Sequence, residues 1–414
     1  MLSPIAYLTC ELKGRDLDSR FLIAAHLAKL GLYAVVGDYW SSLASATVAP
    51  KGCYLFKTTN SVQAAAIEGC ARLGHRVIAA DEEAMSQNEA FAHMTTDPRA
   101  AEHCDRYLAV NEAHKRGILK AFPVVRGKIS VVGSARFDIL RAARTQRPRP
   151  APYVLVNMVF GMVNGTWGDL ETAIDVYRRA LKPDLSDPDS RRQVDERLHY
   201  EREAMREVQA FISQVLAETT IDVVVRPHPS ERPEYWEELY AGNSRVEVVG
   251  RSDPVPWIQH AALMVHCDST TGIEAAILGT PCINLSPDEG WARRLVIPEA
   301  NYSVRDGVAA ATAAKTFLET GKLEVAPRRA DELFPVNGAQ KTARAIAEML
   351  PKPKKALTEL NWNRIERTDL QRDKFTVSPD EAQAAMMRMF TLANVRPRTL
   401  TRLDESAYLV RPDA

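Results

Sequence analysis

The sequence has few cysteines and no long apolar run. Its six cysteines are scattered through 414 residues, and no two form the C-x-x-C pair that is typical of zinc or redox sites. We therefore expect reduced, mostly buried thiols. No apolar stretch approaches the ~18 residues needed to cross a bilayer, and the first residues contain no basic leader. These absences predict a cytoplasmic protein.

An excess of either charge is also absent. The 53 basic residues balance the 53 acidic ones, which argues against nucleic acid as a partner. With 46% apolar and 26% charged residues, the composition is that of an ordinary globular protein. A length of 414 residues exceeds what one core usually organises, so two domains are expected.

Short apolar runs alternate with longer segments of helical period, a pattern typical of parallel α/β sheets. In the first half, strands are predicted at 5–9, 33–36, 52–56, 76–80, 106–110 and 129–132. The helices between them are predicted at 17–30, 61–73, 112–122 and 137–143. A second series has strands at 153–157, 221–226, 246–249, 263–266 and 282–285, with a long helix at 190–217.

Three prolines within the segment 144–152 disfavour helix and suit an extended connector between the two series. We therefore predict an N-terminal Rossmann-like domain at 1–148, a C-terminal nucleotide-binding domain at 149–351 and a tail at 352–414. The tail contains a predicted helix at 379–392 and could cross back over the first domain. The expected fold is α/β of the GT-B type, with two parallel sheets facing a central cleft.

Two loops of the second series combine groups that suit a phosphate. After one strand comes Arg226-Pro227-His228-Pro229, in which the prolines stiffen the backbone around an imidazole that can donate to a phosphate oxygen. After another comes Asp268-Ser269-Thr270-Thr271, at the start of a helix whose N-terminus favours an anion. The alternative for the second loop is an ordinary helix cap. Glu274 would accept from a ribose diol or close a capping box.

The strand at 76–80 is followed by three successive acidic residues, Asp81, Glu82 and Glu83. Carboxylates crowded at a buried strand end repel one another, which raises the pKa of at least one and makes a general base or nucleophile plausible. A solvated acidic face is the other interpretation. Further strand-end candidates for substrate binding are Arg15, Arg136, Asn157 and Asn164.

In their order, these motifs resemble the bacterial surface carbohydrate biosynthesis protein family, a GT-B-like group related to Kdo transferases and, more remotely, to bacterial sialyltransferases. The ordered set runs from Arg15-Asp16-Leu17-Asp18 to Ser269-Thr270-Thr271-Gly272-Ile273-Glu274-Ala275. The resemblance implies that His228, Ser269 and Thr270 bind the phosphate of a CMP-activated sugar, with Glu82 or Glu83 serving the chemistry. The glycine that ends the family's acidic motif is Ala84 here.

The resemblance implies transfer of Kdo or a related ulosonic acid from CMP to a saccharide or lipid-linked acceptor in capsule or lipopolysaccharide assembly. The CMP-sugar is a substrate, and no cofactor is expected. No metal is expected either, because hydrogen-bond donors around the phosphate can replace a divalent cation and the sequence contains no His/Cys ligand cluster. Lys352-Pro353-Lys354-Lys355 is either a solvated linker or a peripheral contact with anionic lipid at the inner face of the inner membrane.

Three other functions stay open. A teichoic-acid-type transferase with CDP-polyol donors also uses a His-Pro motif, followed by a later serine-rich motif. A UDP-sugar 2-epimerase has a nucleotide loop similar to the segment 268–281. A catalytically degenerate GT-B module would bind carbohydrate without turnover, and the departure at Ala84 is its direct support.

Overall fold

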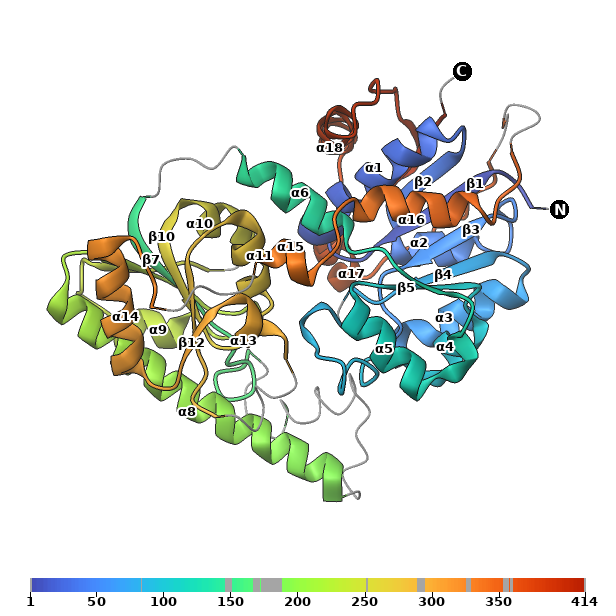
Figure 1. Cartoon of the computed structure of the whole chain (residues 1–414). Coiled ribbons are helices and arrows are strands. Elements are labelled where there is room, and N and C mark those ends of the chain that lie inside the picture. The colour runs from blue at the N-terminus through green and yellow to red at the C-terminus, as the bar shows by residue number, and fades with distance from the viewer. Residues whose placement is uncertain are drawn as a thin grey trace. The chain divides into compact units, whose positions relative to one another are not determined.

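The chain forms two compact α/β units (Figure 1). The computed structural model describes residues 2–82, 84–145, 151–166, 172, 188–250, 252–288, 295–324, 329–352, 357 and 360–412. Unit 1 comprises Met1–Met85, Ala92–Ala142 and Phe334–Ala414, and unit 2 comprises Ser86–Phe91 and Ala143–Leu333.

Unit 1 is built on an eight-stranded sheet of order β13-β14-β2-β1-β3-β4-β5-β6. The strands are β1 (Ile5–Cys10), β2 (Tyr33–Asp38), β3 (Cys53–Phe56), β4 (Arg76–Ala80), β5 (Arg106–Ala109), β6 (Ile129–Val131), β13 (Thr401–Asp404) and β14 (Ala407–Val410). The helices are α1 (Lys13–Lys29), α2 (Tyr39–Ser45), α3 (Ser61–Arg72), α4 (Pro98–His103), α5 (Glu112–Ala121), α6 (Ala135–Arg144), α16 (Gly338–Ala347), α17 (Asp369–Lys374) and α18 (Pro379–Leu392).

Strand β1 shows why this sheet is covered on both faces. Ile5 and Tyr7 belong to one buried apolar cluster, whereas Ala6, Leu8 and Cys10 belong to the other. Alternate residues of a strand point to opposite faces, so a strand that is buried throughout requires two covering layers. Helices α1, α16 and α18 pack together in one layer, and α3 and α4 pack together in the other (Figure 1).

The last part of the chain completes unit 1. Strand β14 pairs antiparallel with β2. The sheet is therefore mixed, whereas a purely parallel sheet was expected. Helix α16 packs against α1, which places the end of unit 2 at Leu333, before the expected domain limit at 351. Helix α18 spans the predicted residues, and its start is set by the capping box that Ser378 and Glu381 form around Pro379 in the first turn.

Unit 2 is built on a six-stranded sheet of order β12-β11-β10-β7-β8-β9, in which every described pairing is parallel. The strands are β7 (Ala151–Asn157), β8 (Asp222–Arg226), β9 (Val246–Val248), β10 (Ala261–His266), β11 (Cys282–Leu285) and β12 (Tyr302–Val304). The helices are α8 (Pro188–Glu218), α9 (Glu234–Leu239), α10 (Pro254–His260), α11 (Thr271–Leu278), α13 (Ile297–Ala300), α14 (Gly307–Thr320) and α15 (Ala330–Leu333). Helices α8 and α14 pack together on one face (Figure 1).

Two expectations from composition can be compared with the structure. All six cysteines are buried and free, as predicted. No helix in the described part of the chain combines the length and apolar character that a membrane crossing requires. Of the basic cluster at 352–355, Lys352 is exposed and the following residues lie outside the described ranges.

Candidate functional site

The site is built at the carboxyl ends of β8, β7 and β10, which are neighbours in the unit 2 sheet. Arg226 ends β8 and donates from Nη1 to Oδ1 of Asn157, at the end of β7, at 3.0 Å. Asn157 in turn donates from Nδ2 to Oγ1 of Thr271 at 2.6 Å. Thr271 donates to Oγ of Ser269 at 2.9 Å. Four residues from three loops that the sequence singled out therefore form one chain of hydrogen bonds.

The direction of this chain determines what remains for a ligand. Because Ser269 accepts from Thr271, its own hydroxyl hydrogen has no acceptor among the described residues. Arg226 is only 4% exposed; its Nη2 donates to the carbonyl of Ser252, but Nε has no partner within the described chain. A buried, unpaired donor is costly unless water or a ligand satisfies it. The two free donors therefore suit an oxyanion.

The start of helix α11 adds a third favourable element. Thr270 occupies the N-cap position without a side-chain cap hydrogen bond, whereas Oγ of Ser269 accepts from the backbone N–H of Thr271, the first residue of α11, at 3.4 Å. Thr270 is exposed, whereas Ser269 is buried. The helix N-terminus carries partial positive charge, which favours an anion beside Ser269.

His266, which sequence reasoning placed only at a strand end, holds the backbone of the loop that contains Ser269. Its Nδ1 accepts from the backbone N–H of Ser269 at 3.1 Å, and its Nε2 lies 3.1 Å from Oδ1 of Asn301. An amide oxygen only accepts, so the imidazole carries its proton on Nε2. Burial lowers the pKa of His266 to about 4, which keeps the ring neutral at pH 7.

Asp268 holds the loop and is not left for a ligand. Its φ of 46° is in the left-handed region, which is uncommon for a residue other than glycine. Its carboxylate accepts from Tyr200, Asn284 and Ser286, each at 2.7 Å. Tyr200 lies on α8, distant in sequence, so the pattern around Asp268 could not reveal this contact.

His228 lies in the loop after β8, with its side chain exposed. The backbone N–H of Ser230 donates to Nδ1 at 3.2 Å, so a neutral ring carries its proton on Nε2. Desolvation by the surrounding protein atoms, together with the positive charges of Arg197 and Arg226, lowers the pKa of His228 below its ordinary value. The ring is therefore a neutral Nε2–H donor at pH 7, the form expected to stabilise charge on a phosphate.

Glu231, which sequence reasoning missed, fixes the position of His228. Its Oε1 accepts from the backbone N–H groups of His228 and Phe160, both at 2.9 Å, and its Oε2 accepts from Trp236 at 3.3 Å. Only 1% of Glu231 is exposed, and burial raises the pKa of its carboxyl to about 7. A buried glutamate in a polar loop has no sequence signature of its own.

The other unit 2 candidates have distinct environments. Asn164, predicted to bind substrate, donates to the carbonyl of Arg232 at 3.0 Å and braces the loop that contains His228. Glu274 is 7% exposed, in the first turn of α11, and its charge acts on Arg226. Pro229 is exposed beside His228.

The acidic loop of unit 1 separates its carboxylates. Asp81 is fully buried and accepts from Thr59 at 3.2 Å and Thr95 at 2.7 Å. Glu82 instead forms an ion pair at 3.0 Å with the buried Arg20 of α1. The expected mutual repulsion is therefore replaced by separate partners. Glu83 lies outside the described residues.

The two candidate arginines of unit 1 lie near strand ends. Arg15 donates to the backbone carbonyl of Glu82 at 3.4 Å, so it braces the acidic loop. Arg136 is half-buried in the first turn of α6, and its backbone N–H donates to Oγ of Ser134 at 3.2 Å.

Comparisons with known proteins establish the fold. No family model matches the chain, and no curated protein matches its sequence. The chain is similar to the UDP-GlcNAc 2-epimerase of Methanocaldococcus jannaschii, with a TM-score of 0.52 and 12% identity over 83% of this chain and 99% of that one. That enzyme has also been solved in complex with UDP-GlcNAc and UDP.

Two further solved structures give the same result. A second UDP-N-acetylglucosamine 2-epimerase has a TM-score of 0.51 and 12% identity over 84% of this chain and 95% of that one. The wall teichoic acid polymerase TagF has a TM-score of 0.50 and 10% identity over 84% of this chain and 89% of that one. The predicted α/β fold of the GT-B type, with two Rossmann-like units, is confirmed. None of these three is a Kdo transferase or a sialyltransferase.

Proposed function

We propose that this chain is a glycosyltransferase of bacterial surface carbohydrate assembly that takes its sugar from a nucleotide-activated donor. The observation that carries the proposal is the directed chain of hydrogen bonds from Arg226, at the end of β8, to Ser269, just before α11, in which Nε of Arg226 and the hydroxyl hydrogen of Ser269 have no partner within the described residues. The guanidinium of Arg226, the hydroxyl of Ser269 and the N-terminus of α11, which this chain of hydrogen bonds connects, each favour a phosphate.

In the proposed reaction, the bond between the anomeric carbon and the phosphate oxygen breaks, and negative charge develops on the departing nucleotide. Arg226 and Ser269 bind the phosphate, and His228 stabilises the new charge through Nε2–H. No divalent metal is required in this scheme. The acceptor oxygen bonds to the anomeric carbon and its proton passes to a carboxylate, the role that the family resemblance implies for Glu82 or Glu83.

For the donor we propose a CMP-activated ulosonic acid such as Kdo, with a saccharide or a lipid-linked glycan as acceptor. The order of the motifs along the sequence supports this choice. A panel of CMP-, CDP-, UDP- and GDP-activated donors in a thermal-shift assay tests it. Stabilisation by the CMP-activated sugar alone supports the proposal, and stabilisation by UDP-sugars or CDP-glycerol alone contradicts it.

A UDP-sugar 2-epimerase is the second candidate, because two enzymes of that activity share the fold at TM-scores above 0.5. Incubation with UDP-GlcNAc, followed by NMR of the product, separates the candidates. Inverted configuration at C2 identifies an epimerase. Polyol phosphate transfer, favoured by the similarity to TagF, is tested with CDP-glycerol in the same panel.

A further inference from the structure

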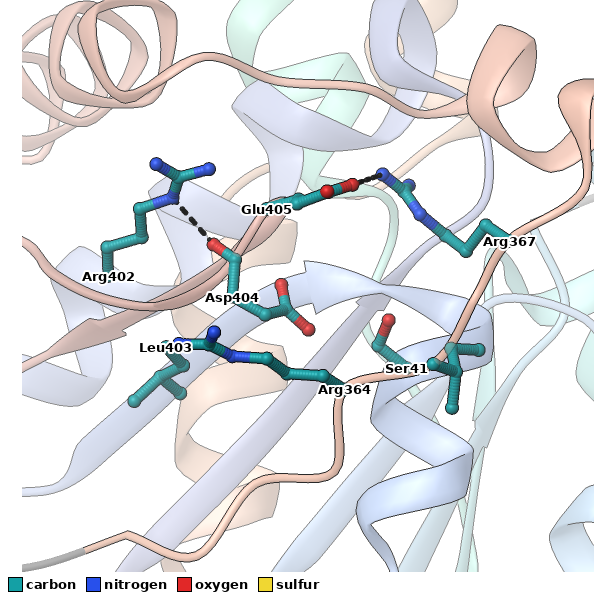
Figure 2. A pocket seen from close by; sticks show the side chains of 8 residues that line it. Ser41, Arg364, Arg367, Arg402, Leu403, Asp404 and Glu405 are labelled. Carbon is teal, nitrogen blue, oxygen red and sulfur yellow. Dashed lines mark hydrogen bonds and ion pairs between the residues drawn. The ribbon is translucent and has the colours of Figure 1, made fainter.

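A cavity of about 300 Å³ lies in unit 1, at the tip of the β13–β14 hairpin near the end of β2 (Figure 2). None of its residues belongs to the donor site of unit 2. The lining residues are Ser41, Arg364, Ile365, Arg367, Arg402, Leu403, Asp404 and Glu405. Its volume is at the lower end of the range for small-molecule sites, ~300–1,000 Å³.

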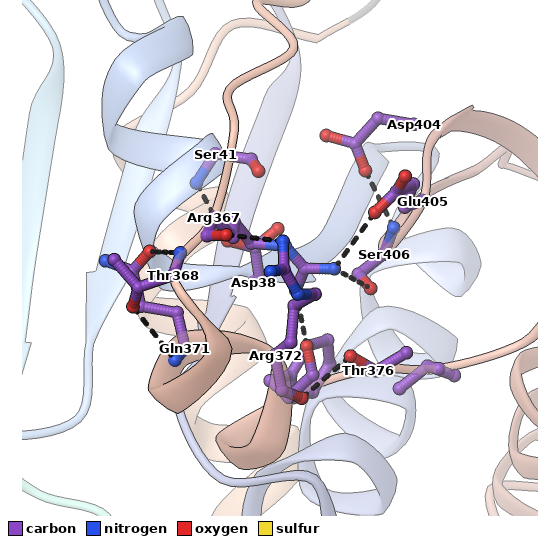
Figure 3. A network of polar contacts seen from close by, with 12 residues as sticks. Asp38, Ser41, Arg367, Thr368, Gln371, Arg372, Thr376, Asp404, Glu405 and Ser406 are labelled. Atoms are coloured by element: carbon purple, nitrogen blue, oxygen red, sulfur yellow. Dashed lines mark hydrogen bonds and ion pairs between the residues drawn. The ribbon is translucent and has the colours of Figure 1, made fainter.

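Two charged residues that line this cavity, Arg367 and Asp404, are held by polar contacts with neighbouring residues (Figure 3). The side chain of Arg367 is 3% exposed; it donates to the carbonyl of Phe375 at 2.5 Å and to Oγ of Ser406 at 3.2 Å. Asp404 accepts from Nε1 of Trp362 at 2.7 Å and from the N–H of Ser406 at 2.8 Å. The guanidinium of Arg367 and the carboxylate of Asp404 are therefore engaged within the protein, and their contacts hold the hairpin tip in place.

Two other guanidinium groups of the cavity keep nitrogens that no described residue binds. Arg402 donates from Nε to the carbonyl of Asp404 at 2.8 Å, which leaves its two terminal nitrogens available. Arg364 has neither a hydrogen bond nor an ion pair within the described part of the chain. Both residues are exposed and line the same cavity (Figure 2). The forked donors of a guanidinium match the paired oxygens of a carboxylate or phosphate.

The cavity also contains hydrogen-bond acceptors and apolar surface. Glu405 is 76% exposed in its side chain and lies 3.4 Å from Arg367, so one of its faces remains open to a ligand. Ile365 and Leu403 line the cavity with apolar atoms. Oxyanion-binding donors, carboxylate acceptors and an apolar surface together fit a ligand that carries an acid group, several hydroxyls and a C–H face.

We propose that this cavity binds a small acidic saccharide, with Arg364 and Arg402 holding its carboxylate or phosphate and Glu405 accepting from its hydroxyls. The inference is independent of the proposed transfer reaction. A chain that responds to no nucleotide donor can still bind this ligand, because the cavity residues belong to a different unit from Arg226 and Ser269.

Isothermal titration calorimetry with glucuronate, glucose 1-phosphate and uncharged glucose tests this proposal. We expect at least one of the two acids to bind, and glucose to bind at least about tenfold more weakly. Arg364→Gln and Arg402→Gln should each weaken binding of that acid by about tenfold, the loss expected for one charge-assisted hydrogen bond. Arg126→Gln is the matched control, because Arg126 is exposed in unit 1 away from the cavity.

A variant with the opposite expected effect separates binding from structural damage. Glu405→Gln keeps a hydrogen-bond acceptor for the ligand's hydroxyls but removes a negative charge from the rim, together with its ion pair to Arg367, so it should strengthen binding of the acid by roughly threefold. Binding of neither acid at millimolar concentration overturns the proposal. So does binding that both arginine substitutions leave unchanged.

Discussion

The imidazole of His266 occupies the space into which a side chain at Gly272 would project, because a Cβ atom there would lie 2.4 Å from Nε2 of His266. The ring cannot move aside easily, since it also holds the backbone of Ser269 and the side chain of Asn301. Gly272 therefore lets the first turn of α11 approach the end of β10 closely enough to present Ser269.

Replacing Gly272 with alanine should destabilise the protein by about 1–3 kcal/mol, because the added methyl group overpacks a buried site. Urea unfolding measures this change. Gly69→Ala is the control, because Gly69 lies within α3 and a Cβ there would have nothing within 4 Å. That substitution should be neutral or stabilising. Equal stability of both variants contradicts the assigned contact.

The free hydroxyl of Ser269 gives a prediction about nucleotide affinity. Ser269→Ala should weaken binding of the nucleotide donor by about tenfold or more, because it removes a hydrogen bond to a charged group. Thr270→Ala should change the affinity little, since Thr270 is exposed and does not cap α11. Calorimetric titration of both variants is the measurement. Similar losses in the two variants would place the phosphate elsewhere.

His228 should matter more for turnover than for folding. If its Nε2–H stabilises the departing nucleotide, His228→Ala should slow transfer by roughly 100-fold, the typical cost of one such donor. His260→Ala, an exposed histidine of α10 in the same unit, serves as the control. Single-turnover rates at saturating donor measure the chemical step. Near-normal rates in the His228 variant would falsify its assignment.

Glu231 should make stability depend on pH. Burial raises the pKa of its carboxyl from 4.5 to about 7, so the folded state binds a proton that the unfolded state has lost. The stabilising contribution is therefore complete below pH 4.5 and is lost as pH rises through 7, by roughly 3 kcal/mol. Glu231→Gln cannot titrate. The difference in unfolding free energy between the two proteins should change across this window and be flat above it.

His266 should act in the opposite direction. Its folded pKa of about 4 lies below the ordinary 6.5, so the unfolded state binds the extra proton. Stability should fall as pH is lowered from 6.5 through 4, again by roughly 3 kcal/mol in total. His266→Asn should reduce this slope. Denaturant titrations at a series of pH values measure it, and an unchanged slope contradicts the assigned neutral state.

The sequence allowed the strands of unit 2 and the strand-end positions of Arg226, Asn157 and Ser269 to be predicted, because a buried parallel strand is a continuous apolar run with a polar residue where it ends. The binding roles of these residues stay predictions. The direction of their hydrogen bonds, which identifies the free donors, depends on the order of strands in the sheet. Sequence periodicity does not determine that order.

Contacts between distant segments were beyond sequence reasoning. Glu82 looked like one of three crowded carboxylates, but its partner Arg20 lies on a helix that the pattern left unconnected to it. Tyr200 reaches Asp268 from the long helix α8. The hairpin of β13 and β14 is short, and its charged residues are typical of an exposed tail. Its place in the sheet becomes clear only from the pairing of β14 with β2 in the structure.

That pairing has a consequence for biogenesis. Gly37 of β2 lies opposite Ala407 of β14, near the other end of the chain. Domains fold in order as a chain leaves the ribosome, yet unit 1 needs a strand that is synthesised after all of unit 2. Throughout that interval the open edge of β2 can pair with another nascent chain. A chaperone that shields this edge would therefore prevent such pairing chiefly before β14 is synthesised.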